Sequence, residues 1–403
     1  MYIARQAIFN RSLKVYGYEL LFRGGIGSIG FDGVSPVQAS ASVLGSLFEN
    51  GIHQITDDKM AFINFDSELL QSDTVELIEP DRLVIEVLED TCVDEALIQR
   101  ILTLKEKGYK IALDDFDESR STNELIPYAD IIKYDIIATP LNQIKGDVKQ
   151  MLAKKKILLA EKIETEEEFK KAKSMGFHLF QGFFFSKPCL ISRSRTLTTV
   201  KSQYTKIISE LKKEDASFQA LADIIEKDAS LAYRLVRVSS ARAGKDMIYT
   251  IRQALVYMGL KEIERWISVL MMQELNHLKP DELMRVSLIR SKFAEQTALH
   301  SKVRDLRYEA SIMGLFSTID AMLDQSMKDA LENISLPVTI MDALIKNDGV
   351  LYPIYRLVTE YEKGDWSGAE ESMKELKLQK DEIYHDYLLA VKWTKEIMDT
   401  IGD

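Results

Sequence analysis

Short apolar runs alternate with helix-like segments through the first half of the chain. The runs are rich in β-branched and aromatic residues, which is typical of buried strands. Between them, 37–49 is amphipathic, 94–107 has apolar residues at helical spacing, and Thr165 begins a segment with acidic residues in its first turn. The apolar runs are 16–22, 61–65, 83–87, 111–113, 131–134, 157–160 and 179–180. This repeated order of strand and helix predicts an α/β domain with a parallel sheet, either open or closed into a barrel.

The second half of the chain has helical periodicity almost throughout. Helix-like segments are 217–226, 230–238, 251–258, 261–275, 281–298, 308–323, 338–346, 351–363, 366–376 and 380–401. A polar stretch rich in serine, arginine and threonine precedes them. We therefore predict an α/β domain over 1–190, a linker over 191–200 and an all-helical domain over 201–403.

Polar side chains stand within or at the end of each predicted strand. They are Glu19, Asn64, Glu86, Asp114, Asp115, Lys133, Asp135, Glu161 and Gln181. In a parallel barrel the carboxyl ends of the strands meet on one face, so these side chains should converge there. A polar group in an apolar strand needs a partner, and one shared site accounts for all of these residues together.

The adjacent carboxylates of Asp114 and Asp115 indicate the chemistry of this predicted site. They repel each other unless a cation compensates, and oxygen-only ligands favour Mg²⁺, Mn²⁺ or Ca²⁺. The predicted ligands are Glu19, Asn64, Glu86 and Asp114 for one cation, and Asp114, Asp115 and Glu161 for a second. Two such cations suit in-line attack of water on a phosphodiester, with Lys133 as a fixed positive charge and Arg23 in contact with a phosphate. The alternatives are that the aspartate pair is two solvated loop acids and that Arg23 is solvated or forms a salt bridge.

The composition is typical of a globular protein with two domains. The chain has 403 residues, 46% of them hydrophobic and 29% charged, and a formal net charge of -11. This acidic balance argues against broad nucleic-acid binding, so we expect no DNA partner. Cys92 and Cys189 form no Cys-x-x-Cys pair and indicate a reducing compartment. The chain opens directly into patterned sequence and has no apolar run of about 18 residues, so we expect no signal peptide, no membrane span and a cytoplasmic location.

Several motifs in the first half resemble those of the EAL family of cyclic di-GMP phosphodiesterases. The motifs are 18–23, 63–65, 85–89, 113–116, 132–135, 160–165 and 181–188. Leu20 stands where the family has its name-giving alanine. The resemblance implies a modified TIM-like (β/α)8 barrel in a bacterial signal-transduction protein. It also implies hydrolysis of cyclic di-GMP to the linear dinucleotide pGpG, with Mg²⁺ or Mn²⁺ as cofactor and Ca²⁺ as inhibitor.

The resemblance also assigns roles to individual residues. The implied metal ligands are Glu19, Asn64, Glu86, Asp114, Asp115 and Glu161. Lys133, Glu161 and Gln181 would be catalytic, acting on the attacking water. Arg23 would bind a substrate phosphate, and Glu89 would anchor the loop that follows the double aspartate. A homodimer through the EAL domain is also implied.

The loop after Asp115 departs from the family pattern. The family has Phe-Gly-Thr-Gly-Tyr-Ser-Ser, whereas residues 116–122 here read Phe-Asp-Glu-Ser-Arg-Ser-Thr. Both glycines are replaced by residues that adopt positive φ only at a cost. The ligands therefore favour catalysis, whereas the loop favours weak or altered catalysis. The alternatives are an inactive EAL domain that serves as a cyclic di-GMP receptor, or a protein-interaction scaffold.

In the helical half, 224–238 and 251–260 resemble the HDOD family, a metal-free relative of the HD phosphohydrolases. Ala229 stands where the family usually has proline. The histidines of this half are His277, His300 and His385, and the pair His385–Asp386 lacks upstream histidine partners at suitable spacing. We therefore expect an all-helical HDOD-like domain that regulates the barrel or binds a protein partner, whose identity the sequence leaves open.

Overall fold

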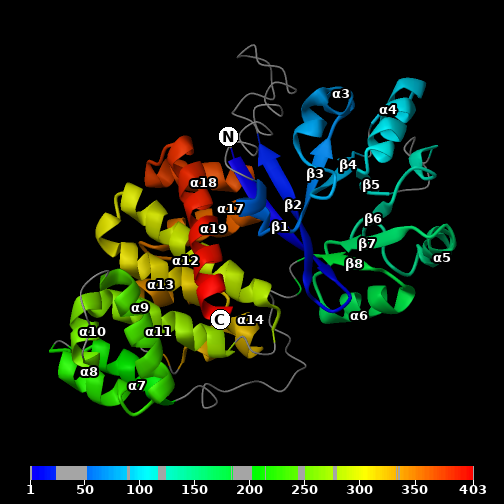
Figure 1. Cartoon of the computed structure of the whole chain (residues 1–403). Coiled ribbons are helices and arrows are strands. Elements are labelled where there is room, and N and C mark those ends of the chain that lie inside the picture. Colours follow the sequence, from blue (N-terminus) through cyan, green and yellow to red (C-terminus); the bar gives the residue numbers. More distant parts are fainter. Residues whose placement is uncertain are drawn as a thin grey trace. The chain divides into compact units, whose positions relative to one another are not determined.

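The computed structural model describes residues 2–23, 52–88, 91–116, 124–182, 184, 202–213, 215–243, 250–275, 279–332, 334 and 336–402 (Figure 1). They form two compact units, one of Met1–Lys187 with Leu357–Asp403 and one of Pro188–Arg356. The helix expected over 37–49, Glu89, the loop over 117–122 and the linker over 191–200 lie outside the described residues. The domain boundaries given above stay a prediction.

Eight strands close into a barrel in chain order, which confirms the barrel form of the predicted α/β domain. The strands from β2 to β8 pair in parallel, namely β2 (Val15–Arg23), β3 (Met60–Phe65), β4 (Leu83–Val87), β5 (Lys110–Leu113), β6 (Ile131–Asp135), β7 (Ile157–Glu161) and β8 (Leu179–Gln181). Strand β1 (Tyr2–Asn10), which the sequence pattern did not predict, is antiparallel to both β2 and β8. Only residues 11–14 separate β1 from β2, too few for a crossover helix, so the two strands form a hairpin.

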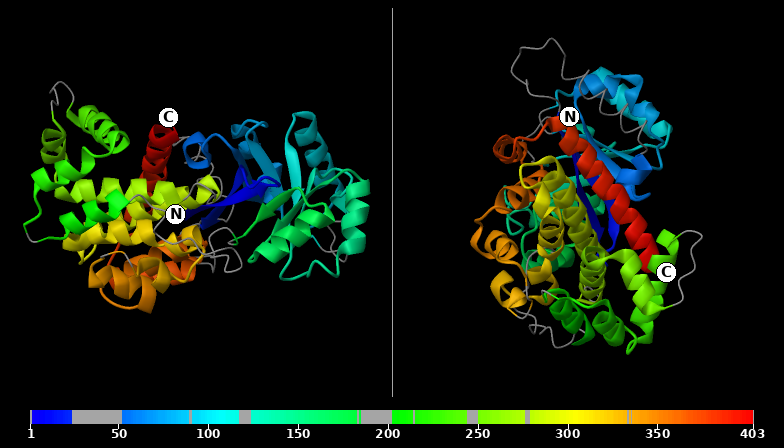
Figure 2. Two further views of the ribbon diagram at one scale, coloured as in Figure 1. Left: turned by 90° about the horizontal axis from the view of Figure 1, so that it is seen from below. Right: turned by 90° about the vertical axis from the view of Figure 1, so that its left-hand side faces the viewer.

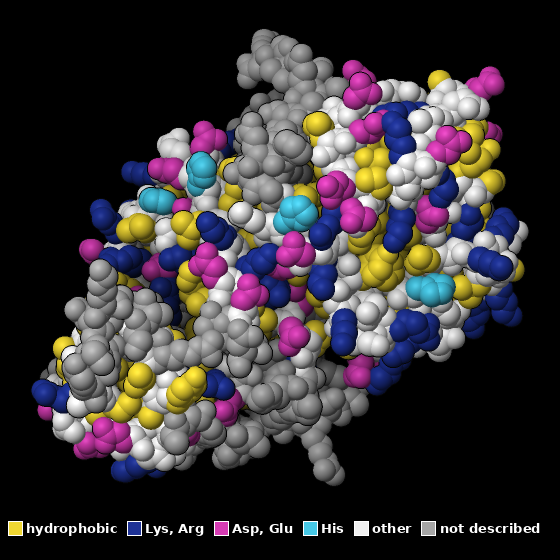
Figure 3. Space-filling model, viewed as in Figure 1, with side chains coloured by type: hydrophobic (Ala, Val, Ile, Leu, Met, Phe, Trp, Pro, Cys, Tyr) yellow, Lys and Arg dark blue, Asp and Glu magenta, His cyan; other side chains and the backbone are white. Residues whose placement is uncertain are grey.

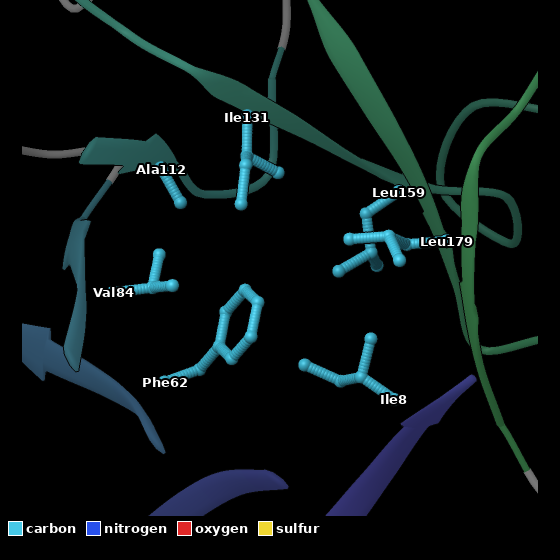
Figure 4. Close-up of a cluster of buried hydrophobic side chains, with 7 residues drawn as sticks. All are labelled: Ile8, Phe62, Val84, Ala112, Ile131, Leu159 and Leu179. Atoms are coloured by element: carbon cyan, nitrogen blue, oxygen red, sulfur yellow. The ribbon is translucent and has the colours of Figure 1, made fainter. Parts of the chain in front are cut away.

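A layer of buried apolar side chains fills the barrel (Figure 4). Its members are Ile8, Phe62, Val84, Ala112, Ile131, Leu159 and Leu179, from every strand except β2. At Gly17 of β2, an added Cβ would lie 2.6 Å from the Met60 carbonyl oxygen and 2.9 Å from the Phe62 ring. Glycine is therefore required on β2 so that Phe62 can occupy the centre of the barrel.

Helices join the parallel strands. They include α2 (Ile52–Thr56), α3 (Ser67–Gln71), α4 (Glu95–Glu106), α5 (Lys145–Ala153) and α6 (Glu166–Met175), and α4 and α6 lie in segments that the sequence predicted as helical. Asp94 caps α4 by accepting the Leu97 N–H, and Thr165 and Glu168 form a reciprocal capping box on α6. Helix α6 ends at Gly176, whose φ of 107° suits glycine.

The described helices confirm the all-helical character of the second half. They are α7 (Ser202–Leu211), α8 (Phe218–Ile225), α9 (Ala229–Ala243), α10 (Ile251–Met258), α11 (Leu260–Leu275), α12 (Asp281–His300), α13 (Arg307–Phe316), α14 (Ile319–Leu323), α15 (Met327–Leu331), α16 (Val338–Met341), α17 (Tyr352–Glu362), α18 (Trp366–Leu376) and α19 (Lys380–Gly402). The single helix expected over 308–323 is interrupted between α13 and α14, where the Ser317 hydroxyl donates to the Gly314 carbonyl at 2.6 Å. The helix expected over 338–346 continues from α16 as a π-helical turn. In the described part of the chain, no helix has both the length and the apolar character needed to cross a membrane.

The C-terminal segment Leu357–Asp403 belongs to the barrel unit, where α19 lies against β1 and α2 (Figure 2). Strand β8 pairs with the end of β1, Ile8–Asn10, and leaves the start of that strand to other partners. The Ile3 N–H donates to the Tyr361 hydroxyl at 3.4 Å, and the Arg5 N–H donates to the Tyr387 hydroxyl at 3.2 Å. Tyrosine hydroxyls of the C-terminal segment thus accept hydrogen bonds from backbone N–H groups at the start of β1, where β8 does not pair.

Candidate active site

A layer of polar side chains lies next to the apolar layer, toward the carboxyl ends of the parallel strands. Residues two apart on a strand face the same side, so Asn64 follows Phe62 into the barrel and Glu86 follows Val84. The same spacing applies on each remaining strand. The polar layer consists of Gln6, Glu19, Asn64, Glu86, Asp114, Lys133, Glu161 and Gln181.

Lys133 of β6 is the centre of this layer. Its ammonium nitrogen lies 2.7 Å from Glu86 Oε1, 2.8 Å from Asp114 Oδ1 and 2.9 Å from Glu161 Oε1. Glu19 Oε1 lies further away, at 3.7 Å. Lys133 and Glu86 are both 0% exposed, so their charges interact with little screening by solvent. The structure thus brings together carboxylates from β2, β4, β5 and β7 around one cation.

Burial and the concentration of carboxylates perturb the protonation of this cluster. Burial raises the pKa of the Glu86 carboxyl well above its usual range, although Lys133 opposes the shift. Burial likewise raises the pKa of Glu161 to about 8. Burial alone would lower the pKa of the Lys133 ammonium, but the surrounding carboxylates, Glu161 foremost, raise it well above its usual range. Without further cations, Lys133 therefore stays charged while some of its carboxylate partners take up protons.

Side-chain amides fix the orientation of Glu19. Gln181 donates through Nε2 to Glu19 Oε2 at 2.5 Å, and Asn64 donates through Nδ2 to Glu19 Oε1 at 3.4 Å. The same Gln181 nitrogen also donates to Gln6 Oε1 at 2.8 Å. Sequence reasoning missed Gln6, because β1 was not recognised as a strand. The alternation of Gln6 with Ile8 was the available signal.

The double aspartate forms a sharp turn after β5. The Asp114 N–H donates to the Val87 carbonyl, and the Phe116 N–H donates to the Lys133 carbonyl, each at 3.0 Å, so both neighbouring strands hold the turn. Between these anchors Asp115 has a φ of 40°, a conformation that costs a non-glycine residue about 1–3 kcal/mol. The turn places carboxylate oxygens of Asp114 and Asp115 near that of Glu161 at the end of β7, and all three lie within 4.8 Å of one another. Burial, with the Asp114 charge, raises the pKa of Asp115.

Asp135 ends β6, but its carboxylate makes structural hydrogen bonds. Its Oδ1 accepts the N–H groups of Ile137 at 2.8 Å and Ala138 at 3.1 Å, and its Oδ2 pairs with Lys162 Nζ at 2.5 Å. Burial opposes a low pKa here, but the Lys162 and backbone hydrogen bonds lower the pKa of Asp135 below its usual value. Sequence reasoning singled out Asp135 by its position and missed Lys162, which follows Glu161 with a φ of 56°.

The donor set fits hard divalent cations. Among the described residues, Asn64 Oδ1 and Glu86 Oε2 are buried acceptors with no hydrogen-bond donor. A buried oxygen without a donor is costly unless a cation binds it, and carboxylate and amide oxygens are the ligands that Mg²⁺ and Mn²⁺ prefer. Arg23 is the last residue of β2, but its side chain lies outside the described part of the chain, as does Glu89.

Two family models match the chain, one in each half. The model of the EAL domain matches residues 2–188, and the model of the HDOD domain matches residues 197–337. Residues 338–403 lie beyond both matches.

Two curated relatives align over almost the whole chain. The uncharacterized protein YuxH of Bacillus subtilis is 34% identical over 410 residues, which cover 99% of each protein. The cyclic di-GMP phosphodiesterase CdgJ of Vibrio cholerae is 30% identical over 404 residues, which cover 98% of this chain and 93% of CdgJ. Among solved structures, the calcium and cyclic di-GMP complex of Klebsiella pneumoniae BlrP1 is 25% identical, with a TM-score of 0.37 over 47% of this chain and 55% of BlrP1.

Proposed function

This chain belongs to the EAL–HDOD family, and on that premise we propose that its barrel hydrolyses cyclic di-GMP to linear pGpG. The observation that carries the proposal is the cluster in which Lys133 lies within 2.9 Å of Glu86, Asp114 and Glu161. Carboxylates at such density suit cation-assisted attack on a phosphodiester and have no comparable use in a simple structural core. The relative CdgJ is named for this activity.

We propose a two-metal site for Mg²⁺ or Mn²⁺, inhibited by Ca²⁺ as the family resemblance implies. Glu19, Asn64, Glu86 and Asp114 would hold one cation, and Asp114, Asp115 and Glu161 a second. When bound, the cations supply positive charge for the phosphoryl oxygens and make a water molecule more acidic. They also favour the ionised form of Glu86 and Glu161, whose pKa values burial raises.

Individual side chains then have separate roles in hydrolysis. Glu161, once ionised, accepts the proton of the attacking water. As the new P–O bond forms, the P–O3′ bond breaks, leaving a 5′-phosphate on the product; the released 3′-oxygen takes up a proton from solvent, and Glu161 returns its proton to solvent. Lys133 keeps its charge throughout and stabilises the negative charge that gathers on the phosphoryl oxygens. Gln181 orients Glu19 through its Nε2, and its buried Oε1, which has no donor among the described residues, accepts a hydrogen bond from the water. Arg23 is proposed as a phosphate ligand, and Glu89 as the anchor of the loop after Asp115.

The test is turnover of cyclic di-GMP by the full chain with Mn²⁺, with the product identified chromatographically. Asp114→Ala combined with Asp115→Ala should abolish the formation of pGpG. The matched control is Asp81→Ala, an exposed aspartate that precedes β4, which should leave turnover unchanged. An active double variant would contradict the two-metal mechanism, and an inactive wild-type chain would contradict the activity.

The receptor hypothesis remains the second candidate. It is favoured by the loop sequence over 116–122, where charged and hydroxyl residues replace the glycines usual in the family. Binding of cyclic di-GMP without turnover in the same experiment would support it. We also retain as proposals a homodimer through the EAL domain, a protein partner for the HDOD domain and a cytoplasmic location.

A further inference from the structure

A cavity of about 370 Å³ lies beside the polar layer of the barrel unit. Asn64 and Leu21 line its barrel side, and Lys363, Gly364 and Trp366 line the other side. Its volume falls in the range of ligand pockets, about 300–1,000 Å³. The cavity therefore connects a proposed metal ligand with a part of the chain that neither family model matches.

The turn between α17 and α18 is held tightly against the barrel. The ring of Trp366 stacks on that of Tyr2, with 5.3 Å between centroids and 9° between planes, and Tyr361 meets the Tyr2 ring edge-on at 5.9 Å. At Gly364, which has a φ of 71°, an added Cβ would lie 2.9 Å from Leu21 Cδ1. The backbone of the turn therefore packs directly on β2 and forms a fixed wall of the cavity.

The walls of the cavity are apolar and polar in about equal measure, and its charged side chains are few. Leu20, Leu21, Phe22, Leu69, Leu88 and Trp366 supply the apolar surface. Asp66 also lines the cavity, but its Oδ1 accepts the Leu69 N–H at 2.8 Å as the N-cap of α3. Among the lining residues, Lys363 contributes the positive charge, and its side chain is exposed.

An anionic nucleotide needs cationic partners at this end of the barrel, because the polar layer is rich in carboxylates. On the face shown in Figure 3, lysine and arginine side chains mix with aspartate and glutamate over much of the described surface, and more lysine and arginine side chains gather toward the lower right edge. Besides Lys133 and the proposed phosphate ligand Arg23, an ammonium group next to the site would strengthen the binding of an anionic ligand. Phosphate oxygens and the O6 and N7 atoms of guanine are the groups that a lysine binds in nucleotides.

We propose that the turn between α17 and α18 completes the nucleotide site, with Lys363 as a substrate-contacting residue. The apolar walls cover a guanine or ribose of cyclic di-GMP, and the Lys363 ammonium binds its phosphate or the guanine edge. This inference rests on the proposed function and adds to it a ligand-binding residue from beyond the EAL domain. It also means that the C-terminal segment sets the affinity for substrate without taking part in the chemical step.

The test compares Lys363→Gln with Lys374→Gln in the full chain. Lys374 is an exposed lysine on α18 that does not line the cavity, so it is a matched control. Equilibrium binding of cyclic di-GMP is measured by calorimetry with Ca²⁺, and turnover is measured with Mn²⁺. Lys363→Gln should weaken binding about tenfold and raise KM by a similar factor, because a charge-assisted hydrogen bond is lost. Its kcat should stay within about twofold, and Lys374→Gln should match the wild type in every measurement.

Two further variants separate charge from shape. Lys363→Arg keeps the charge and should bind nearly as well as the wild type. Leu88→Trp narrows the cavity at a half-buried wall and should weaken binding while the melting temperature of the protein stays unchanged. Unchanged binding by Lys363→Gln, whatever the result for Leu88→Trp, with normal turnover by the wild type, would overturn this inference alone. A wild-type chain that neither binds nor hydrolyses cyclic di-GMP would overturn the proposed function together with it.

Discussion

Replacing Lys133 by methionine tests the energetics of the polar layer most directly. Methionine is similar in length and fills the same space, but it removes the charge that pairs with Glu86, Asp114 and Glu161 at 2.7–2.9 Å. Removing one partner of a buried ion pair costs about 3–5 kcal/mol, because the remaining charge is left without compensation. In chelator and at alkaline pH, we expect Lys133→Met to lower the free energy of unfolding by about that amount.

The cost of this substitution should depend on pH in a defined direction. Burial already raises the pKa of Glu161 from 4.5 to about 8, and loss of the ammonium raises it further. A carboxyl whose pKa is raised on folding stabilises the protein fully when the pH is below its pKa in the unfolded state. This stabilisation disappears as the pH rises through its pKa in the folded state. The difference in stability between wild type and variant should therefore be small near about pH 5, begin to grow near about pH 8, and reach its full size only above the higher pKa of Glu161 in the variant.

The assay is urea unfolding with EDTA at both pH values, with hydrogen exchange of β6 and β7 reporting on the barrel. The control is Lys156→Met, which removes hydrogen bonds from Lys156 Nζ to the carbonyls of Pro127 at 3.2 Å and Ala129 at 2.6 Å. It should cost only about 1 kcal/mol at either pH. If Lys133→Met costs no more than Lys156→Met at alkaline pH, the reasoning about the buried cluster is wrong. The variant should also lose turnover of cyclic di-GMP.

The remaining predictions concern the barrel backbone, a histidine and the cations. Gly182→Ala should lower the free energy of unfolding by about 3 kcal/mol or more, because φ is 147° and the new Cβ would lie 2.1 Å from the Ile163 carbonyl oxygen. Gly146→Ala on α5, with no atom within 4 Å of the new Cβ, should be neutral or stabilising in the same urea titration. Burial, with Arg11 nearby, lowers the pKa of His178, whose Nδ1 accepts the Leu158 N–H at 3.1 Å. The contribution of His178 to the free energy of unfolding is therefore present above about pH 6.5 and is lost on acidification. His178→Gln should flatten this part of the stability profile, and an unchanged profile would contradict the assignment. Mn²⁺ at about a hundredfold excess over its Kd should stabilise the chain by about 2.7 kcal/mol in thermal unfolding, and Asp115→Asn should reduce this gain.

Local pattern was sufficient for most of the secondary structure and for the positions of the polar residues. The parallel strands appear as apolar runs, and helices α10 and α18 have the ends that the sequence predicts. Because side chains alternate along a strand, a polar residue two positions after a core residue must enter the same barrel face. This alternation is why the amino-acid sequence alone places Asn64, Glu86 and Glu161 in the polar layer of the barrel.

The place of β1 in the barrel and the carboxylates that surround Lys133 both depend on contacts between segments distant in the chain. The two-residue spacing of Gln6 and Ile8 is a weak strand signal, and closure against β8 decides that Gln6 reaches Gln181. The pattern also could not show which carboxylates would meet Lys133, because that depends on how the strands are staggered around the barrel.

The position of the C-terminal segment was likewise decided only in the tertiary structure. Its helices have ordinary amphipathic sequences, and their periodicity identifies an apolar face but not the surface that it covers. Tyr361 and Tyr387 pack on β1 because closure of the barrel leaves backbone donors there, at Ile3 and Arg5. The sequence by itself determined the parallel strands, the helical character of the second half and the polar residues on the parallel strands. Long-range packing decided that the end of the chain becomes a wall beside that site.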